Sequence, residues 1–565
     1  MMRGPFSLKI KTYNLVTRTH EMLPAIMSLD AILPPSSGGP APFTDVRAAR
    51  EWLKLLPLIN TRQARHELDE MFTQLNAAQI DAVELLRCLE LLRDAVHTTQ
   101  AGLLPQYTGK ALPLLAQETQ RWQEAQSLWA QLETGYARCW RAVRDGHSKL
   151  AEHHALIAER TLRYGAYVAR GYLLVYRPVP AEVWQRLFAR YRLIEEAGLE
   201  RQTVRDSVID VHGSTMPQSM LISLLLLAAG GVRQLSSRQI LWLDRSLEVL
   251  ATRTTLAFDA ATPQDKTGLQ IDLDAPAPAL RASKPLEGAG VRGIDTLALA
   301  KVLSKRIKLL REGELPQRLG LGNELAPQAA EALLTDLYRR WCDLPTELPL
   351  RRQSGARPIA VEQDLLDLHS QLTRDKPLQP PPEDRQHLDR QALEKLQLFG
   401  QTGSSARPPA PPRAVNTEYW EVQRETAQEL LLLRPASSAS RIQLQQLIGI
   451  APAGSSYLAG VTRSLEEADD LLQVGVRLLP GVPQPARARP TDLMRVGQRD
   501  YSDILLLPAV PALKSAASLI LPCGWHRPGR QLDIWDGSTL YRVRLVQALE
   551  RGSNFERVLY ALQTA

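Results

Sequence analysis

Arginine and hydroxyl side chains lie close together in the stretch YWEVQRETAQELLLLRP, residues 419–435, which is the most informative segment of this chain about function. Its residues alternate in polarity as in a β-strand, and Arg424, Thr426 and Arg434 lie along it. A guanidinium group binds phosphate through paired, charge-assisted hydrogen bonds. The stretch therefore raises the question whether a strand and its turn bind a nucleotide here.

The elements that would position these residues are short strands, because the hydrophobic period changes from helix to strand after residue 415. The segment LLQVGVRLLPG alternates strictly, so its apolar residues share one face. Asp536-Gly537 and Gly552-Ser553-Asn554 each stand between two alternating runs, as in β-hairpins. The C-terminal 150 residues are expected to form small antiparallel barrels.

The chain before these strands has a helical pattern, with apolar residues repeating at intervals of three and four. Its 565 residues are too many for one core, so the fold class expected is multidomain α + β, with a large all-α N-terminal region followed by antiparallel β-barrels. Proline-rich stretches mark the boundaries. The expected parts are a flexible segment 1–44, a helical domain 45–257, a linker 258–290, a second helical block 291–373, a Pro-rich linker 374–415, a first barrel 416–490 and a C-terminal β module 491–565.

Several of these strands match a known type of domain in the same order. They are Trp420-Glu-Val, LIGI, YLAGVTR, LQVGVRLLPG, SLILPCGWHRPGRQLDI and ERGSNFERVLY. In them the C-terminal part resembles PilZ-type domains, the small β-barrels that serve as bacterial cyclic di-GMP receptors. The whole chain resembles proteobacterial proteins in which a long helical region precedes such a barrel. The resemblance implies a regulatory, non-enzymatic module.

The ligand motif of the PilZ type is poorly kept in this chain. In that family an Asn/Asp-x-Ser-x-x-Gly loop and an Arg-x-x-x-Arg segment before the barrel bind the ligand, because small residues let the backbone approach an anion while guanidiniums stack and fork onto it. Here the Asn/Asp position falls on Arg424, the Ser on Thr426 and the Gly on Glu429. Before residue 416 the arginines Arg407 and Arg413 stand six apart.

The resemblance implies two alternative functions. The first is a non-enzymatic bacterial adaptor with a degenerate barrel, acting in a cyclic di-GMP-related pathway through a protein partner that binds the helical region. The second is a cyclic di-GMP effector that uses a different arginine set. No cofactor is expected other than cyclic di-GMP as ligand. The ligand loop expected for it consists of Arg413, Arg424, Thr426 and Arg434.

Charge and cysteine usage narrow the class of protein further. The net charge of +7 comes from 68 basic and 61 acidic residues without a concentrated run, so a nucleic-acid-binding barrel is a weaker alternative. Four cysteines lie far apart without a Cys-x-x-Cys pair, which predicts free thiols in a reducing, cytoplasmic compartment. The apolar run MLISLLLLAAGGV, 220–232, is too short to span a bilayer and predicts a buried helix.

Other residues that could do chemistry favour structural interpretations. His153 and His154 are adjacent, so on a helix they point about 100° apart and do not share a metal ion simply. The segment GWHRPGR, with Arg527 and Arg530, is the second candidate for an anion, although a packed corner between strands is the preferred interpretation. An enzyme in the helical part remains an alternative without a supporting motif.

Overall fold

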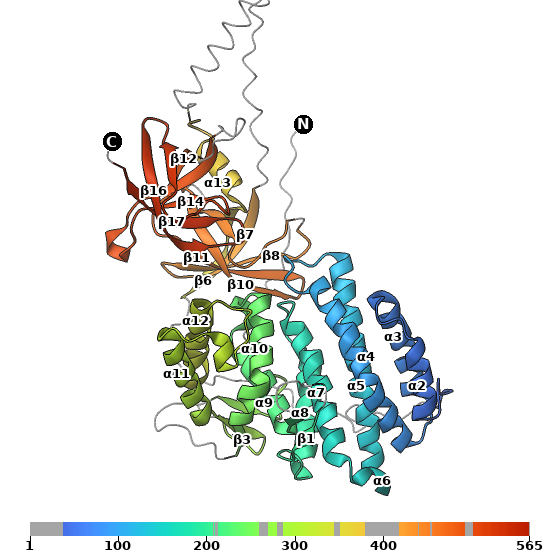
Figure 1. Cartoon of the computed structure of the whole chain (residues 1–565). Helices are drawn as coiled ribbons and strands as arrows, with labels where there is room; N and C mark the ends of the chain where they lie inside the picture. Colours follow the sequence, from blue (N-terminus) through green and yellow to red (C-terminus); the bar gives the residue numbers. More distant parts are fainter. Residues whose placement is uncertain are drawn as a thin grey trace, which may run out of the picture.

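The computed structural model describes residues 38–206, 208, 213–258, 269–278, 286–343, 351–378, 417–438, 440–452, 455–491 and 501–563. They form a helical region and two β-barrels stacked against one end of it (Figure 1). The expected flexible segment 1–44 lies outside the described residues up to residue 37, and the expected linker 374–415 does so from residue 379. The multidomain α + β class expected from the sequence is confirmed.

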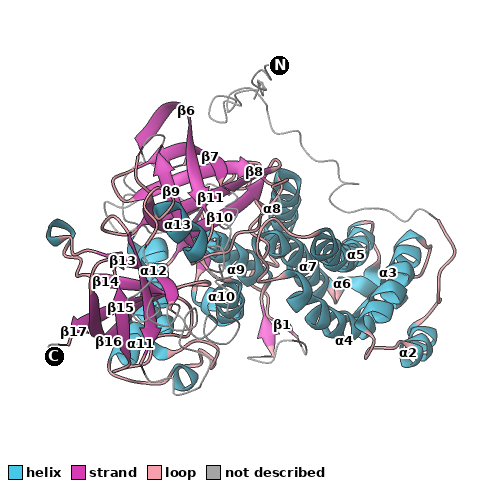
Figure 2. Ribbon diagram, turned by 90° about the horizontal axis from the view of Figure 1, so that it is seen from above, coloured by secondary structure: helices cyan, strands magenta, loops and turns pink. Residues whose placement is uncertain are grey.

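The helices of the helical region pack against the next helix in the chain or the next but one, with the apolar faces that their amphipathic patterns predict. Seen from above, α2 and α3 lie at the side of this region remote from the barrels (Figure 2). The helices are α2 Val46–Leu55, α3 Thr61–Ala77, α4 Ala82–Tyr107, α5 Ala116–Arg144, α6 Ser148–Ala151, α7 His154–Leu173, α8 Ala181–Glu196, α9 Pro217–Ala229, α10 Ser237–Leu250, α11 Leu297–Arg311 and α12 Pro327–Tyr338, with a π-helical turn at Arg339–Asp343.

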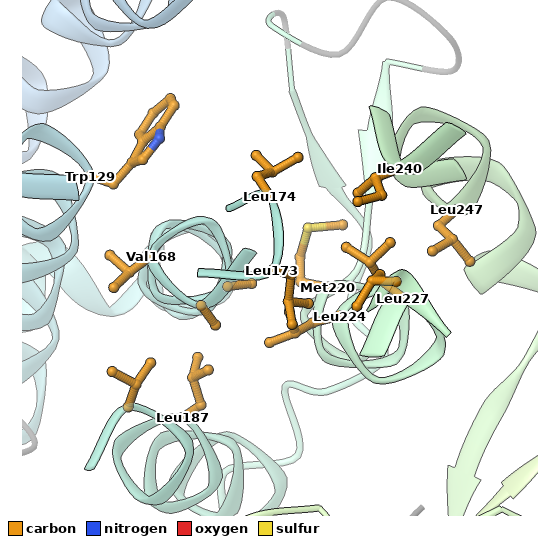
Figure 3. Close-up of a cluster of buried hydrophobic side chains, with 14 of the residues drawn as sticks. Trp129, Val168, Leu173, Leu174, Leu187, Met220, Leu224, Leu227, Ile240 and Leu247 are labelled. Atoms are coloured by element: carbon orange, nitrogen blue, oxygen red, sulfur yellow. The ribbon is translucent and has the colours of Figure 1, made fainter. Parts of the chain in front are cut away.

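Helix α9 is apolar over most of its surface, as is typical of a helix in the centre of a helical region. It packs against α7, α8 and α10, and side chains from all four helices meet around it (Figure 3). It ends at Ala229, after which Gly231 takes the left-handed conformation at φ 76°. The buried helix expected from the apolar run 220–232 is thus confirmed. Within the part of the chain that the structure describes, no helix is both long and apolar enough to cross a bilayer.

A fully buried ion network joins α4 to α7. The Arg93 Nη2 donates to both oxygens of Asp206, at 2.7 and 2.9 Å, and the Arg160 Nη1 donates to Asp206 at 2.9 Å. Burial alone would raise the pKa of Asp206, but Arg163, Arg160 and Arg93 hold it below its ordinary value. Since every charge in it has a partner, the network holds together two long helices and the short strand β1, Val204–Arg205.

A small three-stranded sheet spans the expected linker 258–290, with one strand inside the linker and one on each side of it. Strand β5, Val291–Asp295, pairs with β3, Thr255–Ala257, and with β4, Gln270–Asp272. The alternating sequence around β4 is the local signal for it. The sheet ties the first group of helices to α11 and α12, so the two helical parts expected from the sequence form one continuous core.

The first barrel closes in the strand order β10-β11-β8-β7-β6-β9. In β11 the inward side chains alternate with outward ones, so that Leu472, Val474 and Val476 are buried, whereas β9 is buried along nearly its whole length. A short helix, α13 Leu365–Leu372, follows its first strand. The strands are β6 Arg351–Glu362, β7 Glu418–Glu425, β8 Glu429–Pro435, β9 Leu447–Pro452, β10 Leu458–Ala468 and β11 Leu471–Leu478.

The second barrel closes in the order β12-β13-β14-β17-β16-β15. The hairpin expected at Asp536-Gly537 joins β15 to β16, with Gly537 at φ 97°, and the hairpin at Gly552-Ser553-Asn554 joins β16 to β17. The strands are β12 Gln484–Pro490, β13 Ser502–Leu507, β14 Ser518–Leu521, β15 Gln531–Trp535, β16 Leu540–Arg551 and β17 Glu556–Leu562.

The barrel boundaries differ from the division expected from the sequence at two places. Strand β6 lies inside the expected helical block 291–373, yet it pairs with β7 and β9 of the first barrel. Strand β12 lies before residue 491 but belongs to the second barrel. Both differences have one cause: these strands find their partners in segments distant in sequence, which local periodicity does not reveal.

The first barrel is attached to the helical region through backbone as well as side chains. Leu112 and Ile442 exchange two backbone hydrogen bonds of 2.8 Å, in the manner of paired strands. The backbone N–H of Glu467 donates to the carbonyl of Tyr176 at 2.9 Å, and Arg233 forms an ion pair with Glu466. Because this attachment involves β10 and the segment before β9, the barrel has a defined orientation on the helices.

The two barrels share an apolar core. Phe555, at the start of β17, is fully buried and packs with Leu447 of β9 and Val461 of β10 from the first barrel. Leu368 of α13 covers the same cluster. The Asn554 side chain accepts a hydrogen bond from the Leu447 N–H at 2.8 Å and so closes the polar edge of this contact. The barrels are therefore held as one unit rather than as separate modules.

We predict that Phe555→Ala destabilises both barrels together. The change removes a large buried side chain and leaves a cavity, which costs about 3–5 kcal/mol of unfolding free energy. Leu562→Ala, at a position in β17 that is 68% exposed, is the matched control and should change stability little. Urea denaturation with hydrogen exchange of β9 and β14 measures the effect; loss of protection in the second barrel alone would contradict a shared core.

Candidate ligand cleft between the two barrels

The residues expected to form a ligand loop in the first barrel do not form a ligand site in the structure. Arg413 lies outside the described residues. Arg424 is exposed near the end of β7. Thr426 closes the β7–β8 turn, because its hydroxyl accepts hydrogen bonds from the N–H groups of Glu429, at 2.9 Å, and Gln428, at 3.3 Å. The hydroxyl thus stabilises the turn, as in other ST turns.

Arg434 lies at the opposite end of the same hairpin from Arg424 and is 1% exposed. Its Nη1 donates to the Glu418 Oε2 at 3.0 Å and to the Ser440 Oγ at 2.6 Å. Its guanidinium carbon lies 5.2 Å from the ring centroid of Trp420. Arg434 is therefore part of a buried structural network, and the structure does not bring it together with Arg424.

A large cleft lies instead between the two barrels. It encloses about 720 Å³ and is open to solvent on one side. Arg463 of β10 and Arg477 of β11 come from the first barrel, whereas Lys514, Glu550 of β16 and Arg557 of β17 come from the second. A volume of this size is within the range of small-molecule sites.

The charges lining this cleft are strongly unbalanced. The described residues that line it include four cations and one carboxylate, that of Glu550. The cations are Arg463, Arg477, Lys514 and Arg557, so the cleft has an excess of three positive charges. Burial, and then the neighbouring Arg477, lower the pKa of Arg463, because both disfavour its charged form. The cleft is thus electrostatically prepared for an anion.

The side chains of the cleft are held in place by specific contacts. The Arg477 Nη2 donates to both oxygens of Glu550, at 2.8 and 2.7 Å, and the Arg463 Nη2 lies 3.3 Å from the Glu550 Oε1. The Arg557 Nε donates to the Ser518 Oγ at 3.0 Å. Arginines that are already oriented lose less conformational freedom when they bind a ligand.

The backbone between the barrels is also fixed. The Ser553 N–H donates to the carbonyl of Gln445 at 2.8 Å. A Cβ at Gly552 would lie 2.3 Å from that carbonyl oxygen, so only glycine permits this approach. Since Gln445 lines the cleft, the hairpin of the second barrel sets the position of one wall relative to the other.

A second cavity, inside the helical region, is too small for a ligand. It holds about 30 Å³ and is lined by charged groups such as Arg163, Arg170 and Glu248. That volume accommodates a water molecule. Burial, and then Asp244, raises the pKa of Glu248. We assign this cavity to the buried charge network rather than to ligand binding.

The remaining sequence candidates have structural surroundings. In the segment 524–530, the Arg530 Nη1 donates to the carbonyl of Trp525 at 3.0 Å, and the Gly529 N–H donates to Leu545 at 3.1 Å, as in a packed corner. His154 begins α7 and its ring lies 6.0 Å from that of Trp140. Within the described ranges, no group of three or more His, Cys, Asp or Glu side chains is placed to hold a metal ion.

Sequence reasoning missed the cleft because its residues are separated by almost a hundred positions and belong to two barrels. Arg463, Arg477, Glu550 and Arg557 show no motif along the chain. One pattern that could indicate a ligand site occurs in another part of the sequence: Arg495 and Arg499 have the Arg-x-x-x-Arg spacing of PilZ-type domains. They precede β13 of the second barrel and lie outside the described residues.

Comparisons with known proteins match both parts of the chain. Residues 47–262 match the family model described as "Cyclic-di-GMP receptor FimW, N-terminal domain". Residues 488–563 match the model "FimW C-terminal beta-barrel domain", which falls on the second barrel and not on the first. The cyclic-di-GMP receptor FimW of Pseudomonas aeruginosa PAO1 is 24% identical over 517 residues, with 83% of each chain covered. The resemblance expected from the strand sequences, to receptors with a long helical region and a C-terminal barrel, is confirmed.

We predict that Arg434→Ala lowers the stability of the first barrel, whereas Arg424→Ala does not. Removing Arg434 leaves Glu418 without its cation in a half-buried site, and breaking a buried ion pair in this way costs about 3–5 kcal/mol. Thermal and urea unfolding of both variants measures the difference. Equal stability of the two variants would show that the Arg434 network is dispensable.

Proposed function

From the premise that residues 47–262 belong to the FimW N-terminal domain family and residues 488–563 to the FimW C-terminal β-barrel family, we propose that this protein is a cytoplasmic, non-enzymatic regulatory receptor that binds cyclic di-GMP. The observation that supports a ligand-binding role most directly is the cation-lined cleft of about 720 Å³ between the barrels. The similar protein of Pseudomonas aeruginosa PAO1 is a cyclic-di-GMP receptor, and 83% of its length is covered by the match, which supports the choice of ligand.

Cyclic di-GMP matches the chemistry of this cleft. The ligand carries two phosphodiester groups, each with one negative charge, and two purine rings. The excess of positive charge on Arg463, Lys514 and Arg557 suits the phosphates, because guanidinium groups fork onto phosphate oxygens. Leu513 and Leu549 line the same cleft with 47% and 44% of their surfaces exposed, and they offer apolar surface to the faces of the bases.

We propose further that the output of the receptor is a protein partner bound by the helical region. Helical surfaces accept amphipathic segments without any catalytic geometry. The first barrel supplies one wall of the cleft and is also attached to the helical region through Glu466 and Glu467. In this arrangement the turn at Thr426 has a structural role, and the first barrel contributes to ligand binding through β10 and β11.

We predict that Arg463→Ala weakens binding of cyclic di-GMP about tenfold or more, since losing one charge-assisted contact to phosphate costs at least about 1.4 kcal/mol. Arg463 is 40% exposed at its side chain, so the variant should keep its fold. Isothermal titration of wild type, Arg463→Ala and the control Arg424→Ala measures this, with the prediction that the control binds as wild type does. Affinity should fall as ionic strength rises.

Each other outcome has a defined meaning. If folded wild-type protein gives no heat with cyclic di-GMP and no shift in melting temperature, the receptor function is wrong. If Arg463→Ala binds normally but Arg495→Ala or Arg499→Ala does not, the ligand site lies with the Arg-x-x-x-Arg pair before β13 instead of the cleft. Steeply salt-dependent binding to polynucleotide in place of the dinucleotide would favour a nucleic-acid-binding barrel.

A further inference from the structure

The carboxylate of Glu550 is an unexpected group in a cleft suited to anions. Among the described residues that line the cleft it is the one acidic side chain, and it lies at the centre of the arginines. A carboxylate repels phosphate, so a cleft that recognised only phosphate would bind more tightly without it. Its presence points to a second kind of contact, in which the ligand offers hydrogen-bond donors.

We infer that Glu550 is the residue by which the cleft selects guanine, an inference that rests on the proposed binding of cyclic di-GMP. The Watson–Crick edge of guanine carries two adjacent donors, the N1–H and the N2 amino group. A carboxylate accepts both of them, one with each oxygen. Both oxygens of Glu550 accept from one nitrogen of Arg477, its Nη2, at 2.8 and 2.7 Å, so both oxygens face the same donor side and are available for such a fork once Arg477 leaves.

The local backbone explains why the side chain faces the cleft. Strand β16 has irregular register with β17 between Leu545 and Gln547 and again between Ala548 and Glu550. Such bulges turn the strand and redirect side chains. The side chain of Glu550 is 13% exposed as a result, which keeps bulk water from competing for its oxygens.

Ligand binding then consists of an exchange of partners. Arg477 leaves Glu550 for a phosphate oxygen, and the guanine edge takes the place of the guanidinium on the carboxylate. Both charged groups have partners before and after the exchange, so neither is left buried and unpaired. Arg463 approaches Glu550 through its Nη2, at 3.3 Å, so it can bind a phosphate oxygen and still lie close enough to balance the charge of the carboxylate.

The exchange predicts a definite order of ligands. Adenine has a lone pair at N1 and a C–H at position 2, so it lacks both donors of the guanine pair; its 6-amino group is a single donor beside a repelling lone pair and cannot replace the paired contact. Hypoxanthine keeps the N1–H but lacks the amino group. We expect wild-type protein to bind cyclic di-GMP about tenfold more tightly than cyclic di-IMP and about a hundredfold more tightly than cyclic di-AMP.

The test is isothermal titration of the full-length protein with these three dinucleotides, in wild type, Glu550→Gln and Glu425→Gln. Glu425 forms an ion pair with Arg357 at 2.9 Å in the first barrel, outside the cleft, so it controls for the loss of one negative charge. In Glu550→Gln the preference for cyclic di-GMP over cyclic di-AMP should fall at least about tenfold, and cyclic di-AMP should bind as well as before or better. Glu425→Gln should keep the wild-type preference.

Two results would overturn the inference while leaving the proposed function intact. One is an unchanged preference in a folded Glu550→Gln variant, which would make Glu550 a positioning residue for the arginines. The other needs no variant: equal affinity of wild type for cyclic di-GMP and cyclic di-IMP. A wild-type protein that binds none of the dinucleotides would instead overturn the proposed function and the inference with it.

Discussion

The apolar contact between the two barrels is the constraint on which the cleft depends. Phe555 belongs to the second barrel but packs in a cluster with Leu447 and Val461 of the first, and Leu368 of α13 covers both. Without that contact β10–β11 and β16–β17 would be walls of two independent domains, and linked domains change their relative position easily unless the interface is large and apolar. A shared core makes the cleft preformed. It also explains why the second hairpin requires Gly552, since any side chain there would meet the carbonyl of Gln445.

The arginines of this chain divide into those that hold the fold together and those available for a ligand. Arg93 and Arg160 are buried against carboxylates inside the helical region, and Arg434 is buried within the first barrel. These groups add to the basic composition without providing any anion-binding surface. In the cleft the cations outnumber the carboxylates, because Arg463 and Arg477 share the carboxylate of Glu550. Net charge alone therefore does not reveal a ligand, and the local ratio of cations to carboxylates is the informative quantity.

The sequence predicted those parts of the fold that have a local pattern. Short stretches of sequence are enough to recognise these parts. They are the helices of the N-terminal region, with their helical period, the alternating strand β11, and the hairpin with its turn residues Asp536-Gly537. Strand β6 was not predicted, because its partner β7 follows only after residues 379–416. The expected ligand residues were chosen by alignment to a loop, and neither the burial of Arg434 nor the self-contained turn at Thr426 has a signal in single-sequence patterns. The cleft was missed for the same reason as β6: its two walls are distant in the chain.

Strand β10 connects the cleft directly to the helical region. Arg463 lines the cleft, whereas Glu466 and Glu467, three and four positions further along the same strand, contact Arg233, Arg177 and the backbone of Tyr176. At the spacing of an extended strand these points are only about 10 Å apart. The register between β10 and β11 is irregular at Thr462 and Ser464, immediately beside Arg463, so the strand is bent where the two functions meet. A ligand that moves the Arg463 side chain thus acts on a strand whose next residues are bonded to helices, and no flexible linker lies between the two. This short connection is the physical reason to look for the response to ligand just after α7 and in the turn between α9 and α10 rather than in the distant helices α2 and α3.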